Sequence, residues 1–507
     1  MRRLHPALLA GLPADVQRPG YDRKALQAGI VQLGIGDAPR AWLAAVTDAA
    51  IEASGDLRWG IVGVSLSSNP AHGHEALARQ NGVYTLALRD TGPNGLVRER
   101  LRVIGAVLRV LDARRNPQAV LDQIAHEDTR VISVTLRDDD TAGHGGGEAA
   151  GDDDPACALA PRGAIGLLVH GLKQRRGQGG TAVTVLSCND RPASGRALRS
   201  LVLACASCVD EALAAWIDGN CTFPNGMADR IVLASDDADR ARISQAVGLQ
   251  DGCPVQAEPY LDWVIEDSFV AGRPPWEAAA GPHGMVRVVP DSAPFARLKQ
   301  RMADGPRAAL AYLGAVSGMA TLSGTFSQPP VRALIDAMMR EEIASTLDDV
   351  PGVDLAQYHA RQLERLSNLA LSQGTHRSAA HGSSTVPPCL LAPLRERARA
   401  GQTYDRLALA VAAWLHYLRG QDELGLSYPI CDPLADELAR RQGDAQHAAD
   451  AAGDDPGQAA WRVMDAMALH TDLFGDLTHQ PDVAGELARK LALLRWAGVR
   501  GAVLDAA

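Results

Sequence analysis

Apolar runs typical of buried strands alternate with helix-period stretches through the first part of the chain. The first run, at 28–33, ends in a Gly34-Ile35-Gly36 turn, and the stretch 41–51 after it has the apolar spacing of a helix packed on a sheet. Further strand-like runs follow at 59–66, 83–88, 129–136 and 181–187. Strands and helices that alternate in this way predict a mainly parallel sheet covered on both faces.

The pattern changes near Pro294, where helix-period segments take over and strand-like runs almost vanish. These segments lie at 295–303, 307–320, 330–346, 355–372, 390–418, 430–442, 458–471 and 482–497. The sequence therefore predicts an α/β domain over residues 1–290, followed by a mostly α-helical C-terminal domain over residues 291–507.

Two acidic, glycine-rich segments interrupt the pattern, at 138–156 and at 443–457. Such a composition is typical of solvated, flexible loops. The aspartates around His144 could also indicate a metal site, but a solvated loop is the more common form of such a run. We therefore expect two flexible loops.

Composition and charge narrow the class of protein. With 46% hydrophobic and 22% charged residues, the chain is typical of an ordinary globular protein. The formal net charge of −10 argues against a nucleic-acid binder, because phosphate contacts need an excess of Lys and Arg. No apolar run approaches the roughly 18 residues of a membrane span. Eight scattered cysteines, and an N-terminal segment broken by His5, Pro6 and Pro13, favour a cytoplasmic protein with reduced thiols.

The turn after the first strand has the form of a dinucleotide-binding loop. Glycines allow a tight turn and let a pyrophosphate approach the N-terminus of the following helix. Gly-x-Gly alone is a weak signal, and a simple strand-to-helix turn explains it equally well. Pro39 replaces the usual third glycine, and Ser65 to Asn69 stand where an acidic residue usually binds the ribose. These hydroxyls could bond a ribose or a 2′-phosphate, but no arginine lies nearby in the sequence, so NAD is slightly preferred over NADP.

Other chemistries find less support. Cys205 and Cys208 have C-x-x-C spacing, but they lie in a helical run, where two small residues on one buried face are the simpler explanation. The sequence has no second such pair, no convincing spaced histidine pair, no Gly-x-Ser-x-Gly turn and no P-loop. We therefore expect no metal site.

Several stretches, in order along the chain, together point to one enzyme family. They are 34–41 (GIGDAPRA), 129–135 (TRVISVT), 185–190 (VLSCND), 223–230 (FPNGMADR), 263–269 (WVIEDSF), 272–277 (GRPPWE), 310–314 (LAYLG) and 365–368 (RLSN). Jointly they resemble the long-chain mannitol dehydrogenase family, which groups polyol 2-dehydrogenases with fructuronate and tagaturonate reductases. The resemblance runs from about residue 28 to residue 500.

The resemblance implies a Rossmann-type dinucleotide-binding domain, a helical domain, and zinc-independent hydride transfer between NAD or NADP and a polyol or sugar acid. It implies that Gly34, Ile35, Gly36 and Arg40 bind the cofactor. A lysine acts as acid and base in such enzymes, and the matching residue is Lys299 in the helical domain.

In the family, an Asn and a His follow this lysine by five and eight residues. These offsets fall within about 140° of one helical face, so that all three side chains can point at one substrate oxygen. Here the two positions are Asp304 and Arg307. A further family Asn is Asp190, and a substrate-contacting lysine is Thr385.

Three charged positions do match the family pattern: Asp229, Arg230 and Arg377. Asp229 and Arg377 are the expected substrate-binding residues. From the residues alone, Asp229 and Arg230 are equally well explained as a structural ion pair, and Arg377 as a surface charge.

The altered positions change the chemistry expected of the site. Ketone reduction builds negative charge on oxygen, which hydrogen-bond donors must stabilise, and an ionised Asp offers only acceptors where Asn offers a donor. Asp190 and Asp304 therefore disfavour the alkoxide, and they favour the ammonium form of Lys299. Arg307 acts the other way, because it can neutralise one carboxylate and donate to the substrate. The balance leans against ordinary polyol oxidation.

Two functions remain open. The first is an NAD(P)-dependent oxidoreductase acting on a polyol, keto-sugar or hexuronate through Lys299. The second is a diverged family member with weak or no dehydrogenase activity that acts as a binding or partner protein. In either case we expect a monomer or weak oligomer that binds neither nucleic acid nor membranes. A buried Lys299 beside Asp190, Asp304 and Arg307 would favour the enzyme, and a solvent-facing Lys299 would count against it.

Overall fold

A computed structural model describes residues 1–67, 73–92, 94–136, 163–279, 284–476 and 480–506. The chain forms two compact units, the first of residues 1–92 and 96–296 and the second of residues 93–95 and 297–507. The acidic segment predicted at 138–156 lies outside the described residues. Within the described ranges, no helix has both the length and the apolar character needed to cross a membrane.

Five parallel strands form the central sheet of the first unit. Their order is β6 (Val107–Asp112), β3 (Ile61–Ser65), β2 (Ile30–Leu33), β7 (Val131–Val134) and β8 (Thr184–Ser187). Every residue of β2, β3, β7 and β8 is buried. Because both faces are covered, these strands read as continuous apolar runs, and this is why the sequence pattern located them. The strand order is that of a Rossmann-type dinucleotide-binding sheet, so the predicted fold class is confirmed.

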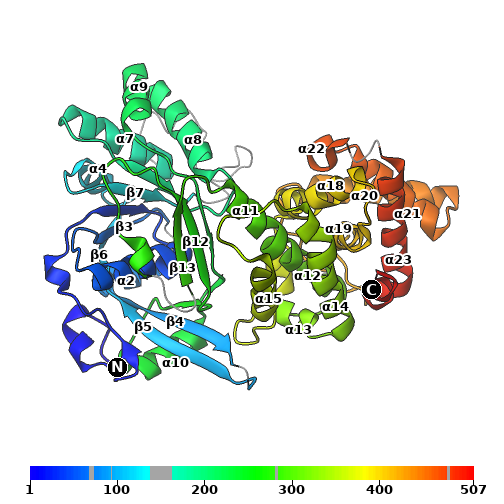
Figure 1. Cartoon of the computed structure of the whole chain (residues 1–507), viewed down its shortest axis with the longest axis horizontal. Coiled ribbons are helices and arrows are strands. Elements are labelled where there is room, and N and C mark those ends of the chain that lie inside the picture. Colours follow the sequence, from blue (N-terminus) through cyan, green and yellow to red (C-terminus); the bar gives the residue numbers. More distant parts are fainter. Residues whose placement is uncertain (68–72, 93, 137–162, 280–283, 477–479, 507) are drawn as a thin grey trace. The chain divides into compact units, whose positions relative to one another are not determined.

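Helices cover both faces of this sheet (Figure 1). On one face α4 (Pro117–Ala125), α7 (Gly163–Gly177), α8 (Ser194–Val209) and α9 (Glu211–Asn220) share a core with Val31 and Ile132. On the other face, Ile30 and Val131 pack with a continuous helix made of α1 (Asp37–Pro39), the π-helical turn η3 (Arg40–Ala44) and α2 (Ala45–Ser54). The glycine turn joins β2 to this helix.

Two smaller sheets complete the first unit. One has the order β1 (Val16–Gln17), β5 (Val97–Ile104), β4 (Tyr84–Thr91), β11 (Val255–Ala257) and β10 (Val232–Leu233), and the other β13 (Gly284–Val289), β12 (Leu261–Glu266) and β9 (Gly226–Asp229). The run predicted at 83–88 forms β4, but β4 pairs antiparallel with β5 and stands outside the parallel sheet. An apolar run indicates a buried strand without identifying its partner. The described residues of this unit also form η1 (Pro6–Gly11), η2 (Arg23–Ala25), α3 (His74–Arg79), α10 (Asp237–Val247) and η5 (Trp276–Ala279).

The second unit is built of helices, as predicted. After α11 (Ala293–Lys299) and the π-helical turn η6 (Gln300–Asp304), its centre is formed by α12 (Gly305–Val316), of which every residue except Arg307 is buried, and by α19 (Asp405–Tyr417). Around them lie α13 (Leu322–Phe326), α14 (Pro329–Ala337), η7 (Met338–Ile343), η8 (Ala344–Thr346), α15 (Leu355–Leu366), α16 (Thr375–Ser378), α17 (Gly382–Val386), η9 (Pro387–Leu391), α18 (Ala392–Arg399), α20 (Ala435–Ala452), α21 (Pro456–Ala468), α22 (Thr471–Phe474) and α23 (Pro481–Ala506).

Two expectations for this unit were wrong. The segment predicted as a loop at 443–457 is helical as far as Ala452, and the helix breaks at Gly453, whose φ is +70°. Alanines on both sides of Gly443 favour the helix strongly enough to carry it through. The helix predicted over 390–418 is interrupted at Gly401, whose φ is +63°.

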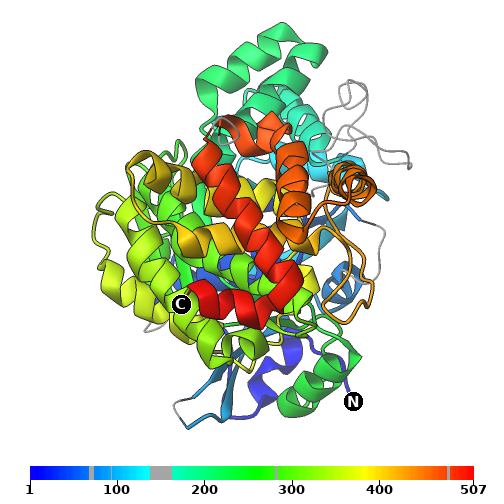
Figure 2. The same cartoon turned by 90° about the vertical axis from the view of Figure 1, so that its right-hand side faces the viewer.

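The last helix, α23, bends at Gly498, which has non-helical backbone angles (φ +69°). It packs on α19 and α21, and Figure 2 shows α21 in orange beside α23 in red. The buried Lys490 in α23 binds Asp405 and Asp505 at 2.8 and 3.0 Å. This ion-pair group fastens the last helix to the start of α19.

Candidate functional site

The glycine turn has the shape that the sequence predicts. Gly34 has φ +83°, and a Cβ built on it would lie 2.9 Å from the carbonyl oxygen of Thr135, so only glycine fits there. Around Gly36 the space for a Cβ is open, and this residue caps the helix that begins at Asp37. Unpaired N–H groups at such a helix start form an anion-binding position.

Arg40 is buried beneath this turn. Its guanidinium donates to the carbonyl oxygens of Gly36 and Cys253, forms a salt bridge with Asp37, and lies over the ring of Tyr84. Its side chain is only 2% exposed. In the structure, Arg40 therefore stabilises the glycine turn through its bonds to Gly36 and Asp37.

The amide of Gln32, fully buried in β2, ties together the carboxyl ends of three strands. Its Nε2 donates to the carbonyl oxygens of Leu33 (3.1 Å) and Gly34 (3.3 Å) and to Thr135 Oγ1 (3.1 Å). Its Oε1 accepts hydrogen bonds from the Ser133 hydroxyl and, at 3.6 Å, from the Cys188 thiol. The network links the glycine turn to the ends of β7 and β8.

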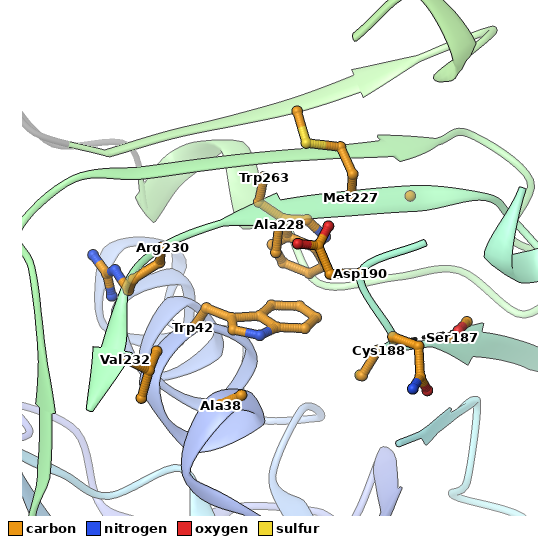
Figure 3. Close-up of a pocket in the computed structure, with 12 residues that line it drawn as sticks. Ala38, Trp42, Ser187, Cys188, Asp190, Met227, Ala228, Arg230, Val232 and Trp263 are labelled. Carbon is orange, nitrogen blue, oxygen red and sulfur yellow. Dashed lines mark hydrogen bonds between the residues drawn. The ribbon is translucent and has the colours of Figure 1, made fainter. Parts of the chain in front are cut away.

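A cavity of about 260 Å³ opens at the carboxyl end of β8, beside the helix that follows the glycine turn (Figure 3). Its lining residues are Ala38, Trp42, Ser187, Cys188, Asn189, Asp190, Gly226, Met227, Ala228, Arg230, Val232 and Trp263. The rings of Trp42 and Trp263 meet edge to face, with centroids 5.0 Å apart, and the Asp190 side chain points toward Trp263. Burial raises the pKa of the Cys188 thiol to about 12, which keeps it protonated. The cavity thus combines flat aromatic walls with a carboxylate, and its size suits a single ring.

Two of the matching charged residues, Asp229 and Arg230, stand beside this cavity in different roles. Arg230 donates to three carbonyl oxygens, those of Ala41 (2.6 Å), Pro259 (3.0 Å) and Tyr260 (3.0 Å). Ala41 lies in the π-helical turn η3, so Arg230 links this turn to the segment at Pro259 and Tyr260. Asp229 is buried in β9, directly opposite Asp262 of β12.

Lys299, the expected acid and base, is buried in the second unit and has a carboxylate partner. Its Nζ lies 2.8 Å from Asp304 Oδ2, and the side chain is 6% exposed. Arg307 lies 3.4 Å from the other carboxylate oxygen of Asp304. The π-helical turn η6, in which the N–H of Gly305 bonds to the carbonyl oxygen of Gln300, brings residues five apart onto one face.

The geometry therefore brings two of the predicted neighbours to Lys299. Asp304 contacts the lysine directly and Arg307 binds the far side of that carboxylate, whereas Asp190 belongs to the first unit. Arg377 is exposed on α16, a short helix packed against α12. Thr385 lies in α17, after His381, whose φ is +57°.

Among the residues that the structure describes, no group of three or more His, Cys, Asp and Glu side chains is arranged to hold a metal ion. Cys205 is buried and Cys208 is exposed on α8, and no disulfide joins them.

Sequence reasoning missed two features of the site. The sequence did carry a signal for the Gln32 network, because a polar residue inside an otherwise apolar strand needs hydrogen-bond partners. No sequence signal indicates that Arg230 binds backbone carbonyls, since its partners lie up to 189 residues away in the sequence.

Comparison with known proteins assigns the family. The models of the Mannitol dehydrogenase Rossmann domain and the Mannitol dehydrogenase C-terminal domain match residues 28–278 and 291–494. The D-mannonate oxidoreductase of Escherichia coli (strain K12) is 34% identical over 499 residues, covering 96% of this chain and 97% of that protein. The uncharacterized oxidoreductase YeiQ of the same organism is 35% identical over 434 residues, 84% of this chain and 86% of YeiQ.

Among solved structures, the ternary complex of Pseudomonas fluorescens mannitol 2-dehydrogenase with NAD and D-mannitol superposes with a TM-score of 0.83, at 29% identity and over 99% of both chains. The fold, the two matched domains and these relatives agree with the resemblance that the motifs carry. The chain belongs to the mannitol dehydrogenase family of oxidoreductases.

Proposed function

We propose that this protein is a nicotinamide-dependent oxidoreductase that interconverts a secondary alcohol of a polyol or sugar acid and the corresponding ketone, without zinc. The observation that carries the proposal is the buried Lys299, held 2.8 Å from Asp304 at a π-helical turn. A buried lysine must be compensated for the loss of water around it, and π-helical turns occur frequently at functional sites. Both features favour a chemical role for Lys299 over that of a surface lysine.

The turn after β2 fits the cofactor. The backbone at Gly34, Ile35 and Gly36 and the N-terminus of the following helix would bind the pyrophosphate, since the open space at Gly36 allows close approach. The aromatic cavity beside Trp42 and Cys188 would receive the nicotinamide ring. When bound, the nicotinamide supplies or accepts the hydride. These contacts suit NAD and NADP alike.

Lys299 would move the proton. During ketone reduction its ammonium group donates a proton to the carbonyl oxygen as negative charge develops there, and during oxidation the neutral amine removes the proton of the hydroxyl. Asp304 favours the ammonium form, so the pair favours reduction. Arg307 offsets the charge of Asp304 and lessens its repulsion of the developing alkoxide.

Arg307, which pairs with the same carboxylate as Lys299, favours an anionic substrate. Guanidinium groups bind carboxylates through paired hydrogen bonds, and Arg307 and Arg377 are available in the same helical unit as Lys299. The name of the Escherichia coli relative, D-mannonate oxidoreductase, supports a sugar acid as the substrate. We therefore place sugar acids ahead of neutral polyols, with Arg377 and Asp229 as substrate-binding residues.

The test is a comparison of ketone substrates. The purified protein is mixed with NADH or NADPH and with fructuronate, tagaturonate or fructose, and the loss of reduced cofactor is followed by absorbance. We expect reduction of a keto acid in preference to fructose. If no ketone is reduced although the cofactor binds, the chain is instead a diverged member of the family that serves as a binding or partner protein.

We also infer that the protein works in a reducing compartment such as the cytoplasm. No disulfide joins any of the seven cysteines in the described part of the chain, which supports this inference. That it acts as a monomer or weak oligomer stays a prediction, which sedimentation of the purified protein would test.

A further inference from the structure

The carboxyl end of β3 is the place where this fold recognises the cofactor ribose. In dinucleotide-binding sheets an acidic residue there accepts a hydrogen bond from the ribose 2′-hydroxyl of NAD, and an arginine nearby accommodates the 2′-phosphate of NADP. In this chain β3 ends at Ser65, and Leu66 and Ser67 follow, so the described end of this strand carries no carboxylate.

The neighbouring strand brings two arginines to this edge. β6 runs parallel to β3 with Asp112 opposite Ser65, and the N–H of Ala113 donates to the carbonyl oxygen of Ser65 at 3.1 Å. Arg114 and Arg115 come next, and both side chains are exposed. They are far from Ser65 in the sequence, and the parallel pairing of the two strands places them together.

The turn that carries these arginines is fixed by Asp112. One carboxylate oxygen accepts hydrogen bonds from the backbone N–H groups of Arg114 (3.0 Å) and Arg115 (3.3 Å), and the other lies 3.3 Å from Arg115 Nε. Arg115 also lies 3.6 Å from Glu75, which itself pairs with Arg79 at 2.9 Å. Asp112 is thus committed to shaping the turn and partly neutralising Arg115.

Arg114 is left with its positive charge uncompensated. Within the described parts of the chain, its guanidinium forms no salt bridge, while the other charges at this edge are paired with one another. An exposed guanidinium at the edge where the ribose is recognised supplies the paired donors that bind a phosphate monoester.

We propose that Arg114, supported by Arg115, binds the 2′-phosphate of NADP and gives this enzyme a preference for NADP over NAD. The proposal rests on the proposed function, because it assigns the cofactor of that same site. It departs from the slight preference for NAD drawn from the sequence, where the strand pairing that joins Ser65 to these arginines is not visible.

The test is a fluorescence titration of the full chain with NADPH and with NADH, for the wild type and for Arg114→Ser. We expect the wild type to bind NADPH at least about tenfold more tightly, because a hydrogen-bonded ion pair is worth that factor or more. Arg114→Ser should lose about that factor for NADPH and leave the NADH affinity nearly unchanged. Arg100→Ser is the matched control, since Arg100 is an exposed arginine of the same unit on β5, in a different sheet.

A second readout needs neither turnover nor the nicotinamide. Adenosine 2′,5′-bisphosphate should compete for the site more strongly than adenosine 5′-monophosphate, and Arg114→Ser should abolish the difference. Tighter binding of NADH than of NADPH by the wild type, or equal weakening of both by Arg114→Ser, would overturn this inference alone. Failure of both dinucleotides to bind would overturn the proposed function as well.

Discussion

At the scale of single residues, Asp304 is the side chain placed to affect the proposed proton transfer by Lys299. Its two carboxylate oxygens face two different cations, Lys299 at 2.8 Å and Arg307 at 3.4 Å. A carboxylate this close to an ammonium group favours the protonated lysine, which can donate a proton and cannot accept one. Arg307 neutralises part of the negative charge of Asp304, and this lessens the repulsion between Asp304 and a developing alkoxide.

Replacing Asp304 with Asn tests this role directly. Asp304→Asn removes the charge that holds the ammonium form, so we expect the alkaline limb of the pH–rate profile for ketone reduction to move to lower pH. Oxidation of the alcohol should become faster at neutral pH, because more of Lys299 is then neutral. The measurement is the rate in both directions as a function of pH.

The matched control is Asp348→Asn, which removes an exposed aspartate of the same unit that pairs with Arg297. Its pH profile should coincide with that of the wild type. An unchanged profile for Asp304→Asn would mean that Asp304 does not control the protonation of the group that transfers the proton.

Among the elements, the ends of β2, β7 and β8 carry the proposed cofactor site, and the Gln32 amide joins them. The same amide accepts from Ser133 and donates to the carbonyl oxygen of Gly34, whose φ of +83° defines the turn. An amide that bonds both to the turn and to a cavity wall fixes their relative position. We regard Gln32 as a positioning residue for the cofactor.

Replacing Gln32 with Met keeps this volume filled and removes all the hydrogen bonds of the side-chain amide. We expect Gln32→Met to weaken NADPH and NADH binding about tenfold each, equivalent to roughly 1.4 kcal/mol. It should also lower the free energy of unfolding by about 2 kcal/mol, because Ser133 and Thr135 lose a partner. Fluorescence titration and urea unfolding give the two quantities.

Gln123→Met serves as the matched control. Gln123 is a buried amide of the same unit that bonds Arg109 and Thr129, near the amino end of β7. Its replacement should reduce stability by a similar amount without altering cofactor affinity. Equal losses of affinity in the two variants would show that Gln32 acts only through stability.

Predictability from sequence differs between these elements for physical reasons. Four strands of the parallel sheet, β2, β3, β7 and β8, are recognisable because burial on both faces makes them mostly apolar, and the Gly34 turn because only glycine fits at φ +83°. The edge strand β6 was not predicted, because most of its residues are only partly buried and the apolar run is therefore broken. The π-helical turn after Lys299 was not foreseen, since one inserted residue barely changes helical periodicity. The family resemblance identified Lys299, Asp304 and Arg307 as candidates. The contacts between them could be found only from the structure.

At the scale of the whole molecule, the pH dependence of stability follows from ionisable side chains that are buried in the helical unit. His416 of α19 is 4% exposed, and burial, followed by the nearby Arg419 and Arg495, lowers its pKa to about 3. In the unfolded chain the same group takes up its proton near pH 6.5. The folded protein therefore keeps His416 neutral over a range in which the unfolded chain is protonated.

This difference predicts acid sensitivity with a definite sign. As the pH falls from about 6.5 toward 3, the unfolded state binds one more proton than the folded state at this residue, so stability decreases by up to about 1.4 kcal/mol per pH unit. His416→Gln cannot take up this proton, and its free energy of unfolding should fall less steeply between pH 6.5 and 4.5. Urea unfolding across this range measures both slopes.

His126→Gln is the control, because His126 is an exposed histidine whose side chain is 53% accessible. Its slope should match that of the wild type. Parallel slopes for the wild type and His416→Gln would contradict the assignment of this pH dependence to His416.

At the scale of the whole chain, the order of the two domains was predictable because their patterns differ so strongly, with strand-like runs before Pro294 and helix-period segments after it. Pairings between distant segments were not, because they depend on topology. β4 pairs antiparallel with β5 outside the parallel sheet, and β6 sets Arg114 beside the end of β3. A linear pattern records burial and periodicity, and it does not record which strands become neighbours.

The central claim is that Lys299 supplies the proton in a nicotinamide-dependent reduction, and one paired measurement on Lys299→Met tests it most directly. The variant and the wild type are titrated with reduced cofactor by fluorescence, and then mixed with the keto acid that the wild type reduces. We expect unchanged cofactor affinity and a rate of reduction lower by about 10²–10⁴, the usual contribution of a general acid. A Lys299→Met protein that binds cofactor and reduces the keto acid at the wild-type rate would contradict the account.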